Sequence, residues 1–156
     1  MKSLIKLGPQ IRSDRQGHGA FGAPRGSRTH NGIDYVANAG DYVCSPVTGI
    51  ITKYGYPYPD DLSYRYVEIT SEPDQLRHRL FYTSMLYVLQ IQSKVKKGEI
   101  VALVQDIAAR YPADDPKDAM INHVHYEIRR PDGTYMNPED FDTGSLTAKD
   151  DKISGD

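Results

Sequence analysis

The segment that most constrains this chain runs from Asn122 to Ile128, where polar and apolar side chains alternate. Alternation over this length is typical of a β-strand with one buried face, because successive side chains of a strand point to opposite sides. His123 and His125 are two residues apart, so both imidazoles lie on the same face of the predicted strand. The segment therefore predicts a sheet that presents a pair of histidines from one strand.

A second cluster of metal-ligand side chains lies earlier in the chain, in the segment His30-Asn31-Gly32-Ile33-Asp34. Its glycine allows the chain to fold the imidazole and the carboxylate inward. Imidazole and carboxylate groups together suit zinc, and three protein ligands leave a fourth position open for water. A lone His-x-His pair is more often an ordinary surface or core feature, whereas ligand candidates in two compact clusters favour a zinc site.

Composition is consistent with one domain and gives no reason to expect a nucleic-acid partner. A chain of 156 residues is long enough for a hydrophobic core, and its net charge is −2 with a pI of about 6.2. The chain has 12 tyrosines against three phenylalanines, and we expect the tyrosines to be half-buried packing residues of strands. We expect the domain to cover residues 1–142 and a disordered tail to cover residues 143–156, which have almost no apolar content.

The single cysteine, Cys44, rules out an intramolecular disulfide, and its apolar neighbours predict a small buried side chain. The N-terminus has no continuous apolar stretch of signal-peptide length, and no run approaches the roughly 18 apolar residues needed to span a bilayer. We therefore expect synthesis in the cytoplasm and no membrane span.

Short strand candidates follow one another along the chain, at residues 41–45, 49–54, 64–70, 77–82, 100–104 and 123–129. This order predicts an all-β domain with a mostly antiparallel sheet and long loops. Two insertions interrupt the pattern, at residues 57–61 and 105–121. The second insertion directly precedes the His-x-His strand, so it either walls the site or is a surface excursion.

Four arginines lie in a glycine-rich segment ahead of the first ligand cluster, namely Arg12, Arg15, Arg25 and Arg28, with Asp14 as the one acid among them. Two interpretations stay open. The arginines form a solvated surface, or they bind carboxylates of an anionic peptide or glycan substrate.

These motifs resemble those of the lysostaphin-type zinc metallopeptidases, which cut peptide cross-links in bacterial cell walls. The family pattern is His-x-x-x-Asp, then Tyr-x-His, then His-x-His followed by an aromatic residue and glutamate. Its first part is matched by His30 and Asp34, and its last part by residues 123–127. Residues 40–51 and 95–101 are similar to the two core hairpins of the family, so the match covers roughly residues 17–141.

The resemblance implies a barrel-sandwich hybrid fold of the duplicated hybrid motif type and one zinc ion per chain. It implies that the zinc ligands are His30, Asp34 and His125, and that His123 is a catalytic histidine. The implied activity is that of an endopeptidase that hydrolyses peptide bonds of peptidoglycan. Glu127 shares the strand face of His125, so it either orients a ligand or is an ordinary surface glutamate.

One element departs from the family pattern, because the Tyr-x-His motif falls at Tyr82-Thr83-Ser84 and a serine stands where a second catalytic histidine is expected. A serine hydroxyl donates a hydrogen bond but cannot act as a base near neutral pH. We expect His18 rather than His78 to substitute, since six residues of strand would place His78 about 20 Å from Ser84.

Residues 14–30, and Phe81-Tyr82 without a following histidine, are also similar to the leukocyte cell-derived chemotaxin branch of the fold. That branch keeps the metal-binding fold and is a signalling protein without known peptidase activity. The alternative function is therefore a catalytically inactive zinc-binding recognition or signalling module. A third reading rests on residues 95–101, which resemble hairpins of biotinyl, lipoyl and phosphotransferase carrier domains, but Lys96-Lys97 lacks the hydrophobic flanks of a modified lysine.

The expected partner is a peptidoglycan peptide. A cell-wall substrate requires delivery without a secretory signal, and we expect that delivery by host lysis, by a phage virion or by an injection apparatus.

Overall fold

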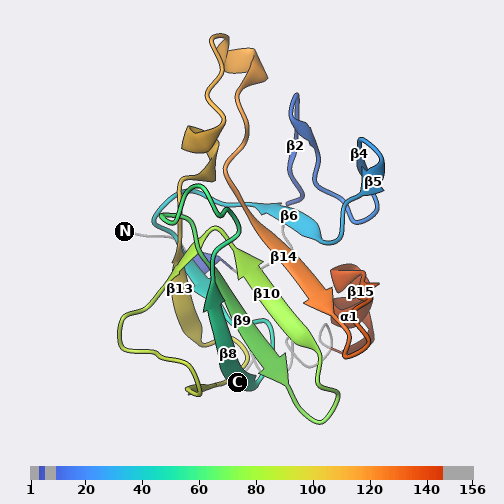
Figure 1. Cartoon of the computed structure of the whole chain (residues 1–156), viewed down its shortest axis with the longest axis vertical. Coiled ribbons are helices and arrows are strands. Elements are labelled where there is room, and N and C mark those ends of the chain that lie inside the picture. Colours follow the sequence, from blue (N-terminus) through green and yellow to red (C-terminus); the bar gives the residue numbers. More distant parts are fainter. Residues whose placement is uncertain (1–3, 6–9, 146–156) are drawn as a thin grey trace.

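Two β-sheets share one hydrophobic core in the computed structural model, which describes residues 4–5 and 10–145 (Figure 1). The larger sheet has the strand order β12-β8-β9-β10-β14-β15, with β6 paired to β14, and the smaller sheet has the order β1-β7-β13-β11. Strands β14 and β6 run along the side of the molecule that carries the long loops (Figure 1). This arrangement sets the position of both predicted ligand clusters.

The larger sheet contains β6 (Ile33–Val36), β8 (Gly49–Gly55), β9 (Tyr66–Ser71), β10 (Arg77–Phe81), β12 (Lys94–Val95), β14 (His123–Arg129) and β15 (Tyr135–Met136). The smaller sheet contains β1 (Leu4–Ile5), β7 (Tyr42–Cys44), β11 (Thr83–Met85) and β13 (Ile100–Val104). The remaining elements are hairpins β2 (Ser13–Asp14) with β3 (Gly17–His18) and β4 (Pro24–Arg25) with β5 (Arg28–Thr29), the 3₁₀ turns η1 (Ile107–Arg110) and η2 (Pro116–Asp118), and helix α1 (Pro138–Ser145).

The predicted all-β, mostly antiparallel fold is confirmed, since β1 with β7 is the one parallel pair among the described strands. Strand β6 was not predicted, because it is short and three of its four residues are buried, so it lacks the polar alternation of a half-exposed strand. Helix α1 begins after Asn137, whose Oδ1 accepts a hydrogen bond from the Glu139 amide, and continues to Ser145. The predicted tail beyond residue 145 lies outside the described residues.

The alternation of β14 separates the core from the site. Val124, Tyr126 and Ile128 are fully buried and belong to the core, which both sheets build. The opposite face of the same strand carries His123, His125 and Glu127, as the sequence pattern predicted. Cys44 is also buried, as expected. No helix in the described segments is long and apolar enough to cross a membrane.

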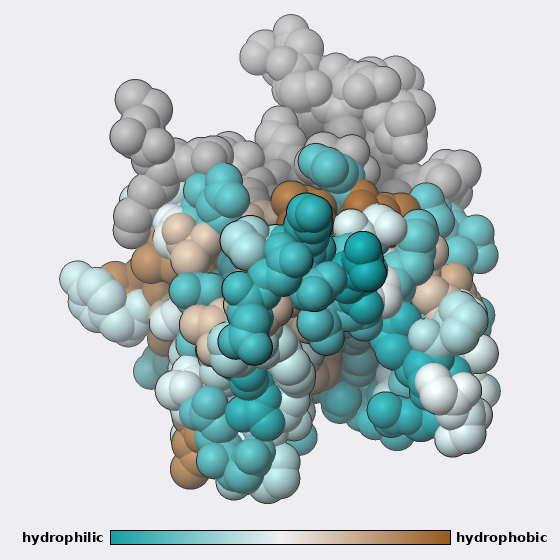
Figure 2. Space-filling view, turned by 90° about the horizontal axis from the view of Figure 1, so that it is seen from above, coloured by the Kyte–Doolittle hydropathy of each residue, from teal (hydrophilic) through white to brown (hydrophobic). Residues whose placement is uncertain are grey.

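Loops converge on the face of β14 that carries the histidines. The β2–β3 hairpin is joined to the loop before β14, because the amide of Ile121 donates a hydrogen bond of 2.8 Å to Asp14 Oδ2. The side-chain amide of Gln16 donates a hydrogen bond of 3.2 Å to the backbone carbonyl oxygen of Asp118. Viewed from the end that carries these loops, the surface is mostly hydrophilic (Figure 2).

His78 lies on the core face of β10 and is fully buried, away from the histidines of β14. Its Nδ1 lies 2.7 Å from the Tyr126 hydroxyl, and its Nε2 lies 3.3 Å from Ser71 Oγ. The prediction that His78 does not serve the site is confirmed by this position. Burial lowers the pKa of His78 to about 4, against an opposing effect of the Asp74 carboxylate.

We predict that His78 makes the fold sensitive to acid. Between pH 6.5 and 4 the unfolded chain binds a proton at His78 that the folded chain does not bind, so stability falls as pH falls and levels off below pH 4. The loss is about 3 kcal/mol in total. In urea titrations from pH 7.5 to 4, the stability advantage of the wild type over His78→Gln should shrink by that amount. A constant difference across this range would contradict the prediction.

Candidate metal centre

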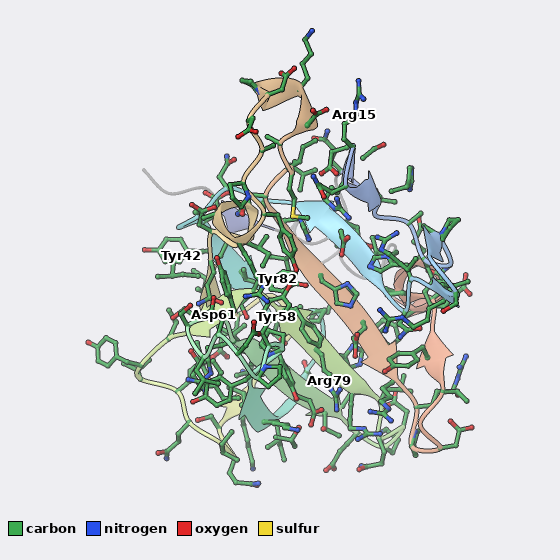
Figure 3. All side chains as sticks on the ribbon, turned by 45° about the horizontal axis from the view of Figure 1, so that its top comes forward. Arg15, Tyr42, Tyr58, Asp61, Arg79 and Tyr82 are labelled. Carbon is green, nitrogen blue, oxygen red and sulfur yellow. The ribbon has the colours of Figure 1, made fainter. Side chains whose placement is uncertain are left out.

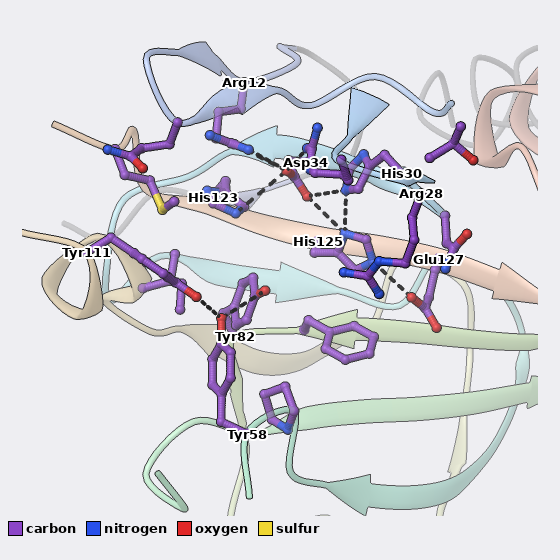
Figure 4. Close-up of a pocket in the computed structure, with 18 residues that line it drawn as sticks. Arg12, Arg28, His30, Asp34, Tyr58, Tyr82, Tyr111, His123, His125 and Glu127 are labelled. Atoms are coloured by element: carbon purple, nitrogen blue, oxygen red, sulfur yellow. Dashed lines mark hydrogen bonds and ion pairs between the residues drawn. The ribbon is translucent and has the colours of Figure 1, made fainter. Parts of the chain in front are cut away.

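Three side chains from the two sequence clusters converge on one point (Figure 4). Asp34 on β6 and His125 on β14 are direct cross-strand partners, and Asp34 Oδ1 lies 2.9 Å from His125 Nδ1. His30 precedes β6, and its Nε2 lies 3.0 Å from His125 Nδ1 and 3.2 Å from Asp34 Oδ1. The structure thus brings together the three residues that the sequence assigned as ligands, and this group could hold a metal ion.

In His30 and His125, the outer ring nitrogen points away from the cluster and the inner ring nitrogen points into it. The hydrogen bond made by the outer nitrogen decides whether the inner nitrogen carries a proton or a lone pair. His30 Nδ1 lies 3.1 Å from the carbonyl oxygen of Ala20, and His125 Nε2 lies 2.9 Å from Glu127 Oε1. Both partners only accept hydrogen bonds, so the outer nitrogens donate and the inner nitrogens of the neutral rings carry lone pairs. Two imidazole lone pairs and a carboxylate oxygen therefore face one another.

This donor set fits a zinc ion. With zinc–ligand distances of roughly 2.0–2.1 Å, the corners of a tetrahedral site lie about 3.3 Å apart, close to the separations in this cluster. In the metal-free protein, burial opposes the charged form of His125, but hydrogen bonds with Asp34 and Glu127 outweigh it and raise the pKa of His125 to about 9. Burial likewise opposes the charge of Asp34, yet hydrogen bonds from His125 and His30 hold the pKa of Asp34 far below its usual range. A cation in this position is therefore strongly favoured.

Arg12 fixes the orientation of the Asp34 carboxylate. Its Nε and Nη2 donate to Asp34 Oδ2 at 3.2 and 3.1 Å, which leaves Oδ1 to face the two histidines. Arg12 is only 3% exposed, and its Nη1 also pairs with Asp14 at 2.7 Å. The sequence left two interpretations of this arginine open, a solvated surface residue or a ligand for substrate carboxylates. Neither is correct for Arg12, because it compensates the charge of the buried Asp34 carboxylate.

Gly32 lets the chain that carries His30 cross closely over β14. A Cβ atom at this position would lie 2.3 Å from the carbonyl oxygen of Tyr126 and 2.9 Å from His125 Cε1. No side chain fits there without moving the strand or the histidine. The glycine of the first motif therefore serves close packing of the two ligand segments.

His125 is held by a row of side chains with alternating charges. Glu127 accepts from His125 Nε2, and its Oε2 lies 3.7 Å from Arg79 Nη1. The Nε of Arg79 in turn donates to Glu68 Oε2 at 2.7 Å. The row runs across three neighbouring strands, β14, β10 and β9. Of the two readings of Glu127, the structure supports the one in which it orients a ligand.

His123 lies beside the cluster but does not belong to it. Its Nδ1 donates to the carbonyl oxygen of Ile121 at 2.8 Å, and its Nε2 lies 3.8 Å from Asp34 Oδ2, too far for a hydrogen bond. Burial lowers the pKa of His123, although the Asp34 carboxylate opposes this effect. A neutral His123 therefore presents a bare Nε2, which accepts a proton but does not donate one.

The cluster lies in a cavity of about 480 Å³. Its lining combines arginines, aromatic side chains and further residues from the loops; it includes Arg12, Gln16, Arg25, Arg28, Tyr58, Phe81, Tyr82, Ile107, Tyr111 and Met120. Ile107, Tyr111 and Met120 come from the insertion at residues 105–121, so of the two alternatives that the sequence left open the structure favours the one in which this loop walls the site. The two acidic lining residues are Asp34 and Glu127.

Two residues considered as catalytic groups do not line the cavity. Ser84 lies on β11 and pairs in register with Leu103 of β13. His18 is exposed, and its Nδ1 accepts a hydrogen bond from the amide of Ala20, so the expectation that His18 replaces the missing histidine is wrong. The residue of the Tyr-x-His motif that does reach the cavity is Tyr82, which sequence reasoning missed.

We predict that Glu127 contributes to metal affinity without touching the metal. Glu127→Gln should weaken zinc binding by about 10- to 100-fold, because the amide is a poorer acceptor for His125 Nε2. Competition against a chromophoric chelator measures the change. The exposed Glu139 provides the matched control, and Glu139→Gln should leave zinc affinity unchanged. Equal affinities for the two variants would show that Glu127 does not support the site.

Comparison with known proteins places these features in a family context. Residues 28–138 match the family model described as Peptidase family M23. Leukocyte cell-derived chemotaxin-2 of Mus musculus is 30% identical over 125 residues, which cover 78% of this chain and 75% of that protein.

Solved structures share the fold at lower sequence identity. The catalytic domain of the antimicrobial peptidase lysostaphin from Staphylococcus simulans has a TM-score of 0.60 at 19% identity, with 80% of this chain and 89% of that chain covered. Helicobacter pylori Csd3 has a TM-score of 0.58 at 22% identity, with 90% of this chain covered. The chain spans only 33% of the Csd3 chain, so it corresponds to one part of that longer protein.

Proposed function

The chain belongs to peptidase family M23, and on that premise we propose that it is a zinc-dependent endopeptidase that hydrolyses peptide bonds of bacterial peptidoglycan. The observation that carries the proposal is the convergence of His30 Nε2, Asp34 Oδ1 and His125 Nδ1 at the base of an accessible cavity. Three protein ligands leave a position for water and substrate, as in catalytic rather than structural zinc sites.

The residues of the site have separate roles in this mechanism. Zinc held by His30, Asp34 and His125 would polarise the scissile carbonyl and lower the pKa of water toward about 7. His123 Nε2 accepts the proton of the attacking water and passes it to the leaving amine. The hydrogen bond from Nδ1 to the backbone holds the ring of His123 in the orientation that this transfer needs.

The arginines of the cavity support a peptidoglycan peptide as the substrate, because its stem peptides carry free carboxylates. Arg28 is exposed, lines the cavity and has no ion-pair partner among the described residues. Arg25 lies deeper, with Nη2 3.6 Å from Asp34 Oδ2. The acids of the cavity are already engaged by arginine or histidine, so its remaining charge favours an anionic ligand.

The proposal is tested by incubating zinc-loaded protein with purified peptidoglycan and analysing the released muropeptides by mass spectrometry. We expect new fragments from the wild type, and none after chelation or with His125→Ala, which should also lose the metal. His123→Gln should retain one zinc per chain and lose activity by about 10²–10⁴-fold, because it removes the proton acceptor. Undiminished cleavage by His125→Ala would contradict the proposed mechanism.

We predict that Arg28 selects substrates with a carboxylate near the scissile bond. Arg28→Gln should lower kcat/KM for such muropeptides about tenfold, since a charge-assisted hydrogen bond is lost. Arg15 offers a matched control, because it is exposed and pairs with Asp118 outside the cavity lining. Arg15→Gln should leave the rate unchanged, and an equal loss in both variants would refute a specific role of Arg28.

A second candidate function is a zinc-binding recognition or signalling module without peptidase activity. Two observations favour it: serine occupies position 84 of the Tyr-x-His motif, and the 30% identical relative bears the name of a chemotaxin. The two functions differ in one outcome. A protein that holds one zinc per chain but releases no muropeptide under any condition is the module and not the peptidase.

A further inference from the structure

The carbonyl oxygen of the scissile bond becomes negatively charged when water attacks. In the proposed mechanism neither His123 nor Ser84 donates a hydrogen bond to this oxygen. His123 keeps a proton on Nδ1, which donates to the carbonyl oxygen of Ile121 at 2.8 Å, so in its neutral form Nε2 only accepts. Ser84 does not line the cavity. Peptide hydrolysis nevertheless produces an oxyanion, and preorganised hydrogen-bond donors at such a position account for a large part of the catalysis of acyl transfer.

Tyr82 occupies the cavity in an unusual backbone conformation. It follows β10 and has a φ of 67°, which bulky residues adopt rarely and which is concentrated at functional sites. Two backbone hydrogen bonds fix it there, from the Tyr82 amide to the Arg65 carbonyl oxygen at 2.8 Å and from the Gln105 amide to the Tyr82 carbonyl oxygen at 2.9 Å. The turn places the Tyr82 ring perpendicular to the His123 ring, with centroids 5.5 Å apart.

Tyr82 lines the cavity, and its hydroxyl group accepts a hydrogen bond from a neighbouring tyrosine. The Tyr58 hydroxyl donates to Tyr82 Oη at 3.4 Å, so the Tyr82 proton is not used in that contact. The Tyr111 hydroxyl lies 2.8 Å from the Tyr58 hydroxyl (Figure 4). The Tyr58 ring stacks against the Tyr82 ring, and the two residues lie close together in Figure 3. Burial raises the pKa of Tyr82 to about 12, so the phenol is protonated throughout the neutral range.

We propose that Tyr82 is a catalytic residue that hydrogen-bonds the oxyanion of peptide hydrolysis, in place of the histidine that the Tyr-x-His motif lacks at Ser84. This inference rests on the proposed function. The water oxygen bonds to the carbonyl carbon, the π electron pair moves to the carbonyl oxygen, and the water proton moves to His123 Nε2. Tyr82 donates its hydrogen bond to that oxygen. The C–N bond then breaks, and the amine nitrogen leaves with the proton from His123.

The first test is Tyr82→Phe, which removes one hydroxyl group and keeps the packing of the ring. We expect kcat on muropeptides to fall about 10²–10³-fold while KM and the zinc content stay unchanged. Tyr87 is 97% exposed and does not line the cavity, so Tyr87→Phe is the matched control and should retain full activity. An unchanged kcat in Tyr82→Phe overturns the inference and leaves the peptidase proposal intact.

The second test requires no turnover. A phosphinic pseudopeptide of the stem-peptide sequence has a tetrahedral, anionic centre and resembles the intermediate. Its affinity for zinc-loaded Tyr82→Phe should be 10- to 100-fold weaker than for the wild type, and unchanged for Tyr87→Phe. If the wild type binds the phosphinate in this Tyr82-dependent manner but cuts no muropeptide, the inferred donor stands and the peptidase proposal fails. Equal affinities, or no binding by the wild type, overturn the inferred donor.

Discussion

Three ligand atoms, His30 Nε2, Asp34 Oδ1 and His125 Nδ1, face one another across about 3 Å, and a positive charge among them stabilises this arrangement. The surrounding architecture depends on this constraint. Asp34 and His125 are cross-strand partners, so the pairing of β6 with β14 fixes two of the three atoms. The third comes from a segment that crosses β14 so closely that Gly32 leaves no room for a side chain.

The charges around the cluster are compensated in pairs. Arg12 holds one oxygen of Asp34 and also pairs with Asp14, whereas Glu127 holds His125 and lies beside Arg79. Each inner ligand atom is therefore aimed by an outer partner, which is how proteins tune metal affinity and ligand orientation. Two neighbouring residues have complementary roles in the proposed reaction. His123 accepts a proton, and Tyr82 is the inferred hydrogen-bond donor.

Much of the fold could be predicted because alternation is a local property of the sequence. The strand from His123 to Arg129 and the placement of Val124, Tyr126 and Ile128 on its core face followed from periodicity alone. The pairing of the His30 and His123 clusters followed from ligand chemistry and from a family resemblance. Strand β6 was missed, because a short strand buried on both faces has no alternation to detect.

The remaining parts of the site depend on contacts between distant segments. Arg12 was indistinguishable from the other arginines of its loop, and its burial against Asp34 follows from the fold of that loop over β6. Ser84 was singled out by its position in a motif, but the positive φ of Tyr82 interrupts strand alternation there and turns the tyrosine into the cavity. No local pattern signals that conformation, since non-glycine residues adopt it rarely.

The most direct test of the central claim is X-ray absorption at the zinc edge, on protein loaded with one equivalent of zinc. The structure predicts four light ligand atoms at roughly 2.0–2.1 Å, with the outer-shell scattering of two imidazoles and no sulfur. One imidazole should be lost in a His30→Ala variant that is loaded in the same way. A sulfur ligand at about 2.3 Å, or an unchanged imidazole count in that variant, would show that zinc binds elsewhere in the chain.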